Sequence, residues 1–379
     1  MPRPSLSALF VLFSAVQCYA QAALQPAGPR PTLEEVRKGM GIASEGDLRG
    51  QLDIVGFASS PEQMARVWEL AGLPPTPEAL ESPPPAGVVG AICPHDDYLY
   101  AGRVDRQVLP LVTAKTVVLV GVFHRYRRFG AHDALVFDPY RAWRAPDGDI
   151  RVSELREELL GGLPPEARLQ EAAMHDAEHS LESLAYWLKH SRADLEIVPI
   201  IVPSAPFPRL EQLAAQLGRA LAASMTRRGW TLGRDVAIVI SADAVHYGAD
   251  FKYTPYGEGG IDAYAKAVEQ DLALLRGPLA GPVSAEKARQ FYATCVNPDR
   301  PDEYRLTWCG RFSIPVGLLL LAETAKALGL ATPVGIPIAY GTSVNGPELP
   351  VREVGLGATA PANLHHFVGL PGVVFTLRD

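Results

Sequence analysis

The chain has 379 residues, and its 35 lysine and arginine residues against 42 aspartate and glutamate residues give a formal net charge of −7. This acidic balance argues against a protein that coats nucleic acid, because such proteins need a basic face. Hydrophobic residues make up 47% of the chain and charged residues 20%, which excludes widespread disorder. The length suits one large α/β domain with additions, or two domains.

The first twenty residues resemble a secretory signal peptide. Arg3 is followed by an apolar run over residues 6–16, and small residues flank a cleavage point after Ala20. The apolar run is shorter than the ~20 residues that span a bilayer. We therefore predict a periplasmic or secreted protein without a membrane span. A lipoprotein anchored through Cys18 is less favoured, because Gln17 fits poorly before a lipid-modified cysteine.

Three cysteines remain after such a cleavage, and they are Cys93, Cys295 and Cys309. Their odd number leaves at least one of them unpaired within the chain. A free thiol in an oxidising compartment persists when it is buried or bound to a metal, so one of the three is a candidate for chemistry. A disulfide between Cys93 and Cys309 stays open as an alternative that would remove the Cys309 thiolate.

Residues 21–85 form a proline-rich extension that ends in a run of prolines at 83–85 and carries no catalytic pattern. We interpret it as a packing extension or adaptor, followed by one α/β domain over residues 86–379. In that domain, short apolar runs rich in β-branched residues predict strands at Val88–Cys93, Thr116–Val122, Ile197–Val202, Val236–Ile240, Val334–Ala339 and Val373–Leu377.

Helices are predicted between several of these strands. Apolar residues at helical spacing over 181–188 follow Ser180 as a candidate N-cap, and longer helices are expected over Leu210–Met225 and Ile314–Leu328. Strands without polar alternation, interleaved with helices, indicate a sheet that is covered on both faces. The fold class is therefore α/β, with a central, mostly parallel sheet flanked by helices.

Polar residues follow three of the predicted strands directly. His95 follows the first, His124 the second, and Asp243 and His246 the fourth. Ligands of open α/β sheets bind beyond the carboxyl ends of the strands, so these side chains are expected to form one site. Neutral imidazoles bind metal ions, and nearby carboxylates orient them.

Cys309 adds a candidate thiolate to this site. It lies just before the helix predicted over Ile314–Leu328. We expect the positive end of that helix and the neighbouring Arg311 to lower the pKa of the thiol.

A competing motif lies at residues 175–179, where His175, Glu178 and His179 match the H-x-x-E-H signature of some zinc peptidases. That chemistry needs both histidines on one face of a helix. If Ser180 caps the next helix, His179 precedes that helix, so a zinc hydrolase is the minor alternative.

Short motifs in order along the chain together resemble the Memo family, whose bacterial members are called AmmeMemoRadiSam system protein B. The motifs that carry the likeness are residues 94–102, 119–124, 145–149, 178–182, 241–248, 309–311 and 340–343. The resemblance implies a fold like that of the class III extradiol ring-cleaving dioxygenases. It also implies that His95, His124 and Cys309 bind a metal ion, and that catalytic side chains line the pocket, namely Glu178, His179, Asp243 and His246.

The sequence departs from the family beside the first histidine, where Asp96 and Asp97 stand in place of alanine and glycine. These residues place extra negative charge at the mouth of the pocket. Two imidazoles and a thiolate suit Fe(II) or Cu, with Zn a weaker choice.

The favoured function is a metal-dependent oxidoreductase acting on a small organic substrate, with His246 or His179 as the acid or base, oriented by Asp243. The alternative is a metal-binding or partner-binding module without turnover, which leaves a protein partner open.

Overall fold

The computed structural model describes residues 29–73 and 87–377. The predicted signal segment at 1–20, Cys18 and the prolines at 83–85 lie outside the described residues. Within the described ranges, no helix is both long and apolar enough to cross a bilayer.

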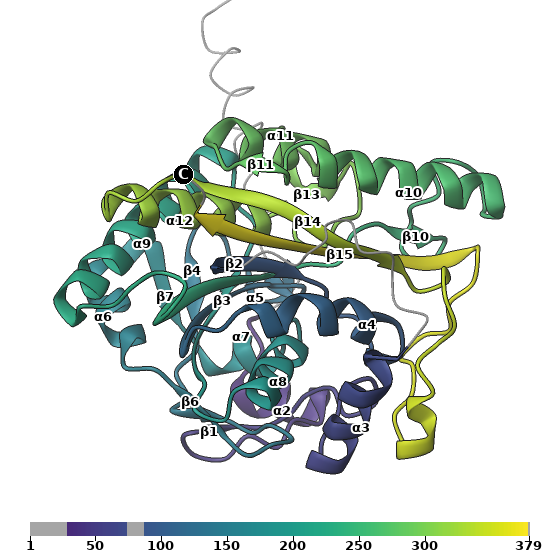
Figure 1. The fold of residues 1–379 in the computed structure, drawn as a ribbon, viewed down its shortest axis with the longest axis horizontal. Helices are drawn as coiled ribbons and strands as arrows, with labels where there is room; N and C mark the ends of the chain where they lie inside the picture. The colour runs from purple at the N-terminus through teal and green to yellow at the C-terminus, as the bar shows by residue number, and fades with distance from the viewer. Residues whose placement is uncertain (1–28, 74–86, 378–379) are drawn as a thin grey trace, which may run out of the picture.

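A single large sheet organises the described residues (Figure 1). Its centre is the parallel run β6–β8–β3–β9–β2. These strands span β2 Val88–Cys93, β3 Thr116–Val122, β6 Ile150–Val152, β8 Glu196–Val202 and β9 Val236–Ser241. Every residue of β2, β3 and β9 is buried, as expected for strands covered on both faces. The predicted, mostly parallel α/β sheet is confirmed.

Antiparallel strands extend this centre beyond β2. The order there is β2–β15–β14–β11, with β15 at His366–Leu377, β14 at Pro333–Thr342 and β11 at Gly281–Pro282. The remaining short strands are β1 Leu48–Arg49, β4 Leu135–Phe137, β5 Ala142–Trp143, β7 Arg168–Gln170, β10 His246–Gly248, β12 Val296–Asn297 and β13 Arg300–Tyr304.

Helices pack on both faces of the sheet (Figure 1). On one face, α12 at Ser313–Ala327 packs on β3 and β9 and against α9 at Phe207–Arg228, which also contacts α6 at Leu155–Gly162. On the other face, α4 at Tyr98–Val108 packs on β2, β14 and β15 and contacts α3 and α8. The other α-helices of the described residues are α2 Leu33–Met40, α3 Pro61–Ala71, α5 Tyr126–Phe129, α7 Ala172–Asp176, α8 Glu182–Ser191, α10 Ile261–Arg276 and α11 Ala285–Cys295.

The predicted helix cap at Ser180 is wrong. The N-cap of α8 is Leu181, which makes no capping hydrogen bond through its side chain. The Ser180 hydroxyl donates instead to the carbonyl of Val122, at the end of β3. The Ser180 hydroxyl therefore makes a long-range hydrogen bond to the sheet instead of the local helix cap that the sequence predicts.

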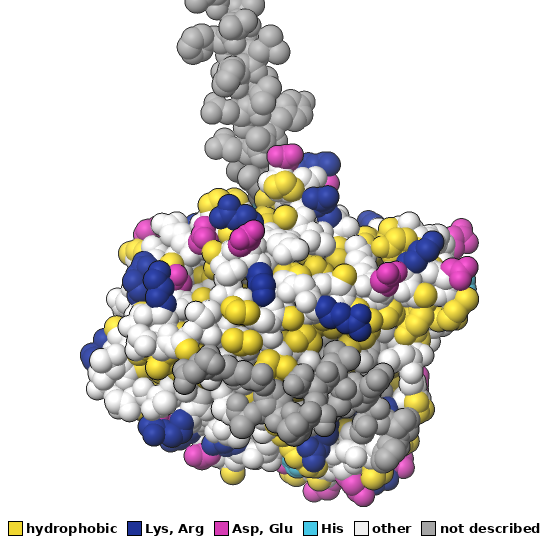
Figure 2. Space-filling view, turned by 45° about the horizontal axis from the view of Figure 1, so that its top comes forward, with side chains coloured by type: hydrophobic (Ala, Val, Ile, Leu, Met, Phe, Trp, Pro, Cys, Tyr) yellow, Lys and Arg dark blue, Asp and Glu magenta, His cyan; other side chains and the backbone are white. Residues whose placement is uncertain are grey.

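The described part of the N-terminal extension belongs to the sheet and packs on the domain. Its helix α2 begins with a capping box between Thr32 and Glu35, and β1 pairs in parallel with β5. A continuous cluster of buried apolar side chains includes Val36 and Phe57 of this segment together with the central strands. On the face drawn in Figure 2, basic and acidic side chains are interspersed rather than gathered by sign.

Candidate metal centre

Three neighbouring strands bring the predicted ligands to one edge of the sheet. β3, β9 and β2 are adjacent, and Cys93 at the end of β2 lies in register with Ser241 at the end of β9. His124, Asp243 and His95 follow these strand ends within two residues. The convergence that the sequence predicts for these side chains is therefore present in the fold.

Cys309 reaches the same edge from the loop before α12. Its backbone can approach because residue 310 is glycine: a Cβ atom added at this position would lie only 2.4 Å from the Cβ of Ala242. Any larger residue at 310 would push the Cys309 loop away from the end of β9. The glycine thus has a direct role in placing the sulfur.

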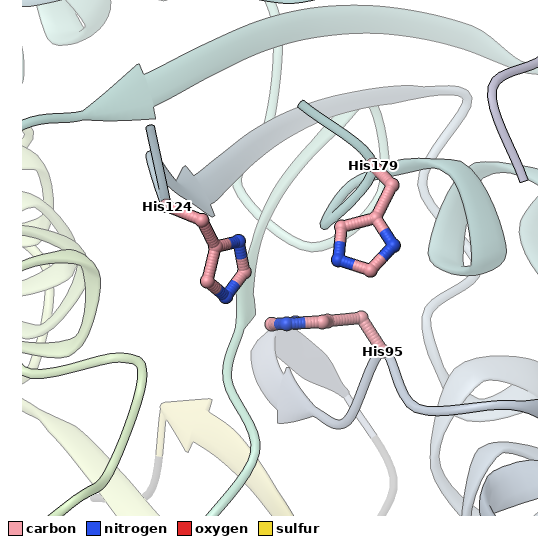
Figure 3. Close-up of side chains that lie close together, drawn as sticks. All are labelled: His95, His124 and His179. Carbon is pink, nitrogen blue, oxygen red and sulfur yellow. The ribbon is translucent and has the colours of Figure 1, made fainter. Parts of the chain in front are cut away.

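Three imidazoles form the first group that could hold a metal ion (Figure 3). They belong to His95, His124 and His179, and each offers a ligand atom within 4.8 Å of the others. The ring centroids are 5.3 Å apart for His95 and His124, 5.7 Å for His95 and His179, and 5.4 Å for His124 and His179. The three rings face one shared space.

A second group consists of His95, Asp243 and Cys309, all of them buried. The Nε2 atom of His95 lies 3.8 Å from the Cys309 sulfur and 3.4 Å from Oδ2 of Asp243. The predicted ligands His95, His124 and Cys309 are thus divided between two groups that share His95. Cys309 and His124 also line one hollow, together with His246 and Phe251.

Hydrogen bonds fix the tautomers of two of these histidines. Ser241 donates its hydroxyl to the carbonyl of Ser180, so the same oxygen accepts the Nδ1–H of His95 at 2.7 Å. His124 directs its Nδ1 to a carboxylate oxygen of Glu178 at 2.9 Å. In both rings the Nε2 lone pair is left for an ion, as in metal sites whose ligands are oriented from behind.

Glu178 acts as an anchor in this geometry. One of its oxygens accepts the backbone N–H of His124 at 2.7 Å, and the other accepts the backbone N–H groups of His179 and Ser180. Burial opposes ionisation, but His124 and His179 and these hydrogen bonds together lower the pKa of the Glu178 carboxyl. A fully engaged carboxylate orients its neighbours rather than exchanging protons with a substrate.

His179 has a carboxylate neighbour that the sequence did not reveal. Asp53 places Oδ2 3.8 Å from Nδ1 of His179, while its other oxygen accepts the backbone N–H groups of Val55 and Gly56. Burial works against protonation, yet Asp53 and Glu178 raise the pKa of His179 to about 9. Asp53 lies in the extension that sequence reasoning treated as packing, and no motif signals its role.

His246 is oriented by carbonyl groups and not by Asp243 as expected. Its Nδ1 lies 3.0 Å from the carbonyl oxygens of both Ala244 and Thr307. Asp243 instead accepts the backbone N–H of His95 at 2.8 Å. Burial lowers the pKa of His246, so the ring is neutral with its Nε2 lone pair available.

The expected lowering of the Cys309 pKa is wrong. Burial, reinforced by the charge of Asp243, raises the pKa of this thiol well above its ordinary value. Arg311 directs its guanidinium to the hydroxyl of Tyr126 and over the ring of Tyr304. The desolvation of the sulfur therefore outweighs the helix terminus.

The described cysteines are free and buried, so the Cys93–Cys309 disulfide is not formed. The Cys93 thiol donates to Asp105 at 3.2 Å. The zinc-peptidase motif also fails structurally, because His175 ends up in α7 with its Nε2 on the carbonyl of Val136, whereas His179 lies beyond that helix. The two histidines do not share a helical face.

A cavity of about 220 Å³ opens over the histidines. Its walls include four aspartates and two aromatic residues, and they are Asp53, Asp96, Asp97, Asp243, Tyr100 and Phe251. Asp53 and Phe251 were not predicted as site residues. The acidic pair at 96–97, noted in the sequence, lines the cavity, and Asp97 is buried there with one carboxylate oxygen accepting the backbone N–H and the hydroxyl of Thr359.

Asp271 on α10 ties together the loops that carry His246 and Cys309. This fully buried carboxylate accepts the indole N–H of Trp308 at 2.6 Å, the hydroxyl of Tyr340 at 2.7 Å and the backbone N–H of Val245 at 3.3 Å. Burial raises the pKa of Asp271 to about 7, although the three donors act in the opposite direction.

This raised pKa predicts a pH-dependent contribution to stability. The folded state holds the Asp271 proton more tightly than the unfolded chain, whose pKa is near 3.8, so the contribution is complete below about pH 4 and is lost as the pH rises towards 7. The slope reaches at most about 1.4 kcal/mol per pH unit. Urea unfolding should show the wild type losing stability relative to Asp271→Asn over this range.

The matched control is Asp262→Asn, at an exposed position of the same helix. Its difference from the wild type in the free energy of unfolding should vary much less over this pH range, because the side chain is exposed to solvent. A pH-independent difference for Asp271→Asn, or one of the opposite sign, would contradict the assignment.

Comparison with known proteins places this site in a family. A model of the Memo-like protein family matches residues 73–344. A MEMO1 family protein of Thermococcus onnurineus is 27% identical over 197 residues, which cover 50% of this chain and 63% of the relative. The MEMO1 family protein of Thermococcus kodakarensis is 26% identical over a match that covers 56% of this chain and 72% of the relative. The MEMO1 family protein of Methanosarcina mazei is 30% identical over a match that covers 42% of this chain and 55% of the relative.

Two features of these matches bear on the site. The matched part spans less than two thirds of the Thermococcus onnurineus protein. Arg49, Asp53 and Phe57 precede the residues that the family model covers, whereas all of the predicted ligands lie inside them.

Proposed function

The chain belongs to the Memo-like protein family, and from this premise we propose that it is a metal-dependent oxidoreductase acting on a small organic substrate. The observation that carries the proposal is the preformed set of His95, Asp243 and Cys309 at one edge of the sheet, with His124 beside it. Two imidazoles, a carboxylate and a cysteine sulfur that loses its proton to the ion would be the ligands for a redox-active metal.

The spacing of the donors fits an ion. Bonds of about 2.0–2.3 Å to nitrogen, oxygen or sulfur place two ligands of a tetrahedral ion roughly 3.3–3.7 Å apart. The His95 nitrogen lies 3.4 Å from Asp243 and 3.8 Å from the Cys309 sulfur, so these donors need only small shifts. A thiolate with imidazoles favours Fe(II) or Cu over Mg²⁺ and Ca²⁺, which prefer oxygen ligands alone.

The bound ion would supply redox chemistry and a site for the activation of O₂. His246 would accept a proton from the substrate, because its carbonyl partners hold Nδ1 and leave Nε2 towards the cavity. Asp243 would keep the His95 backbone and ring in place. Phe251 would offer an apolar wall to an aromatic substrate.

Replacing His124 with alanine tests the proposal. The anaerobically purified chain is loaded with Fe(II) or Cu, and O₂ consumption is followed with 4-methylcatechol and with a small thiol. We expect turnover by the wild type and a loss of at least about 100-fold in His124→Ala, because an imidazole that holds the reactive ion is gone.

His190→Ala is the matched control, since that ring lies between Asp147 and Trp68, outside the cavity. It should consume O₂ like the wild type. Tight metal binding with no turnover above that of the free ion would overturn the enzymatic proposal in favour of a metal-binding module.

A further inference from the structure

His179 lies beside the two imidazoles already placed at the ion, and its Nδ1 also has an oxygen neighbour. Nδ1 is hydrogen-bonded to Ser241 at 2.7 Å in His95 and to Glu178 at 2.9 Å in His124, whereas in His179 it lies at an ion-pair distance of 3.8 Å from Oδ2 of Asp53. A ligating histidine commonly has its second nitrogen held in this way by a carboxylate or another oxygen. The opposite nitrogens are left to face the shared space of Figure 3.

We propose that His179 is a third imidazole ligand, which joins His95, His124 and Cys309 at the ion, with Asp53 orienting the third ring. The inference rests on the proposed function for the presence of an ion. It changes the role of His179 from an acid or base to a ligand. It also gives the N-terminal segment, which precedes the residues matched by the family model, a part in the metal site.

The segment around Asp53 is built to hold this position. Glu182 accepts the backbone N–H groups of Leu52 and Asp53 at distances between 2.9 and 3.1 Å. Arg49 donates to the carbonyls of His175 and Glu178, which fixes the turn that carries His179. The segment around Asp53 and the turn that carries His179, which are distant in sequence, are thereby tied to each other.

The ring also has a defined face. Phe57 stacks against His179 with the ring centroids 6.2 Å apart and the planes at 23°. The ligand atoms of the three histidines lie within 4.8 Å of one another. Because the His179 side chain is 39% exposed, it can still turn by the small amount that brings its nitrogen to bonding distance from an ion between them.

The experiment uses Co(II) as the probe with the full chain at pH 8.5. Affinity is measured by titration, the thiolate charge-transfer band in the near ultraviolet reports on Cys309, and paramagnetically shifted N–H resonances report the ligating imidazoles. We expect His179→Ala to weaken Co(II) binding at least about tenfold, to lose one shifted imidazole resonance and to keep the thiolate band. Asp53→Asn should weaken binding by a smaller factor.

Two controls separate this inference from the proposed function. His190→Ala, which removes a histidine outside the site, should bind Co(II) like the wild type. An unchanged affinity and resonance count in His179→Ala, while His95→Ala and His124→Ala lose the ion, would overturn the role of His179 and leave the proposed site intact. Unchanged binding in all three variants would overturn the proposed site as well.

Discussion

Replacing His95 with alanine is expected to weaken metal binding by more than about 100-fold, the largest effect of any single ligand. His95 belongs to both groups of candidate ligands, the three imidazoles and the set with Asp243 and Cys309. Even the residues behind metal ligands contribute about 10- to 100-fold to affinity. The measurement is a titration with Co(II), together with the metal content of the purified chain.

The other ligands should give graded losses. His124→Ala removes a donor from the first group only, and Cys309→Ser removes one from the second only, so each should retain more affinity than His95→Ala. Far-UV circular dichroism would show that the variants are folded. If His95→Ala keeps its metal with wild-type affinity, the two groups do not form an ion site.

The sheet could be predicted from the sequence because its central strands are buried on both faces. The predicted bounds Val88–Cys93 and Thr116–Val122 are those of β2 and β3, and β9 extends its prediction by one residue to Ser241. A short uninterrupted run of apolar residues is typical of a strand that is buried on both faces of a sheet. β15 was predicted from residue 373 but begins at His366, because pairing with β14 and β10 extends it.

The site was predictable where its residues follow strands directly, since strand order alone brings His95, His124 and Asp243 together. The contributions of Asp53 and Phe57 could not be predicted from the sequence. Their positions depend on contacts that no local pattern encodes, above all the pair of Arg49 with Glu182, 133 residues apart. The prediction of a lowered pKa for the Cys309 thiol was wrong for a related reason. The local sequence shows the helix terminus but not the burial of the sulfur, which has the larger effect on the pKa.

That same pair leads to the largest expected effect on stability. Arg49 and Glu182 are both fully buried, with Nη1 and Oε1 2.5 Å apart. Arg49→Met would leave the Glu182 carboxylate without its cation and would remove the hydrogen bonds that Arg49 donates to the carbonyls of His175 and Glu178. Breaking a buried ion pair in this way typically costs about 3–5 kcal/mol, so we expect a loss of that size in the free energy of unfolding in urea.

Two comparisons make the prediction specific. The solvent-exposed pairs of Arg66 with Glu353 and Glu69 should contribute little to stability, so Arg66→Met serves as the matched control. The double variant Arg49→Met/Glu182→Leu removes both buried charges and should recover part of the stability. Because Arg49 also fixes the turn at His179, the single variant should bind Co(II) more weakly. Stability within about 1 kcal/mol of the wild type would show that Arg49 does not hold this turn.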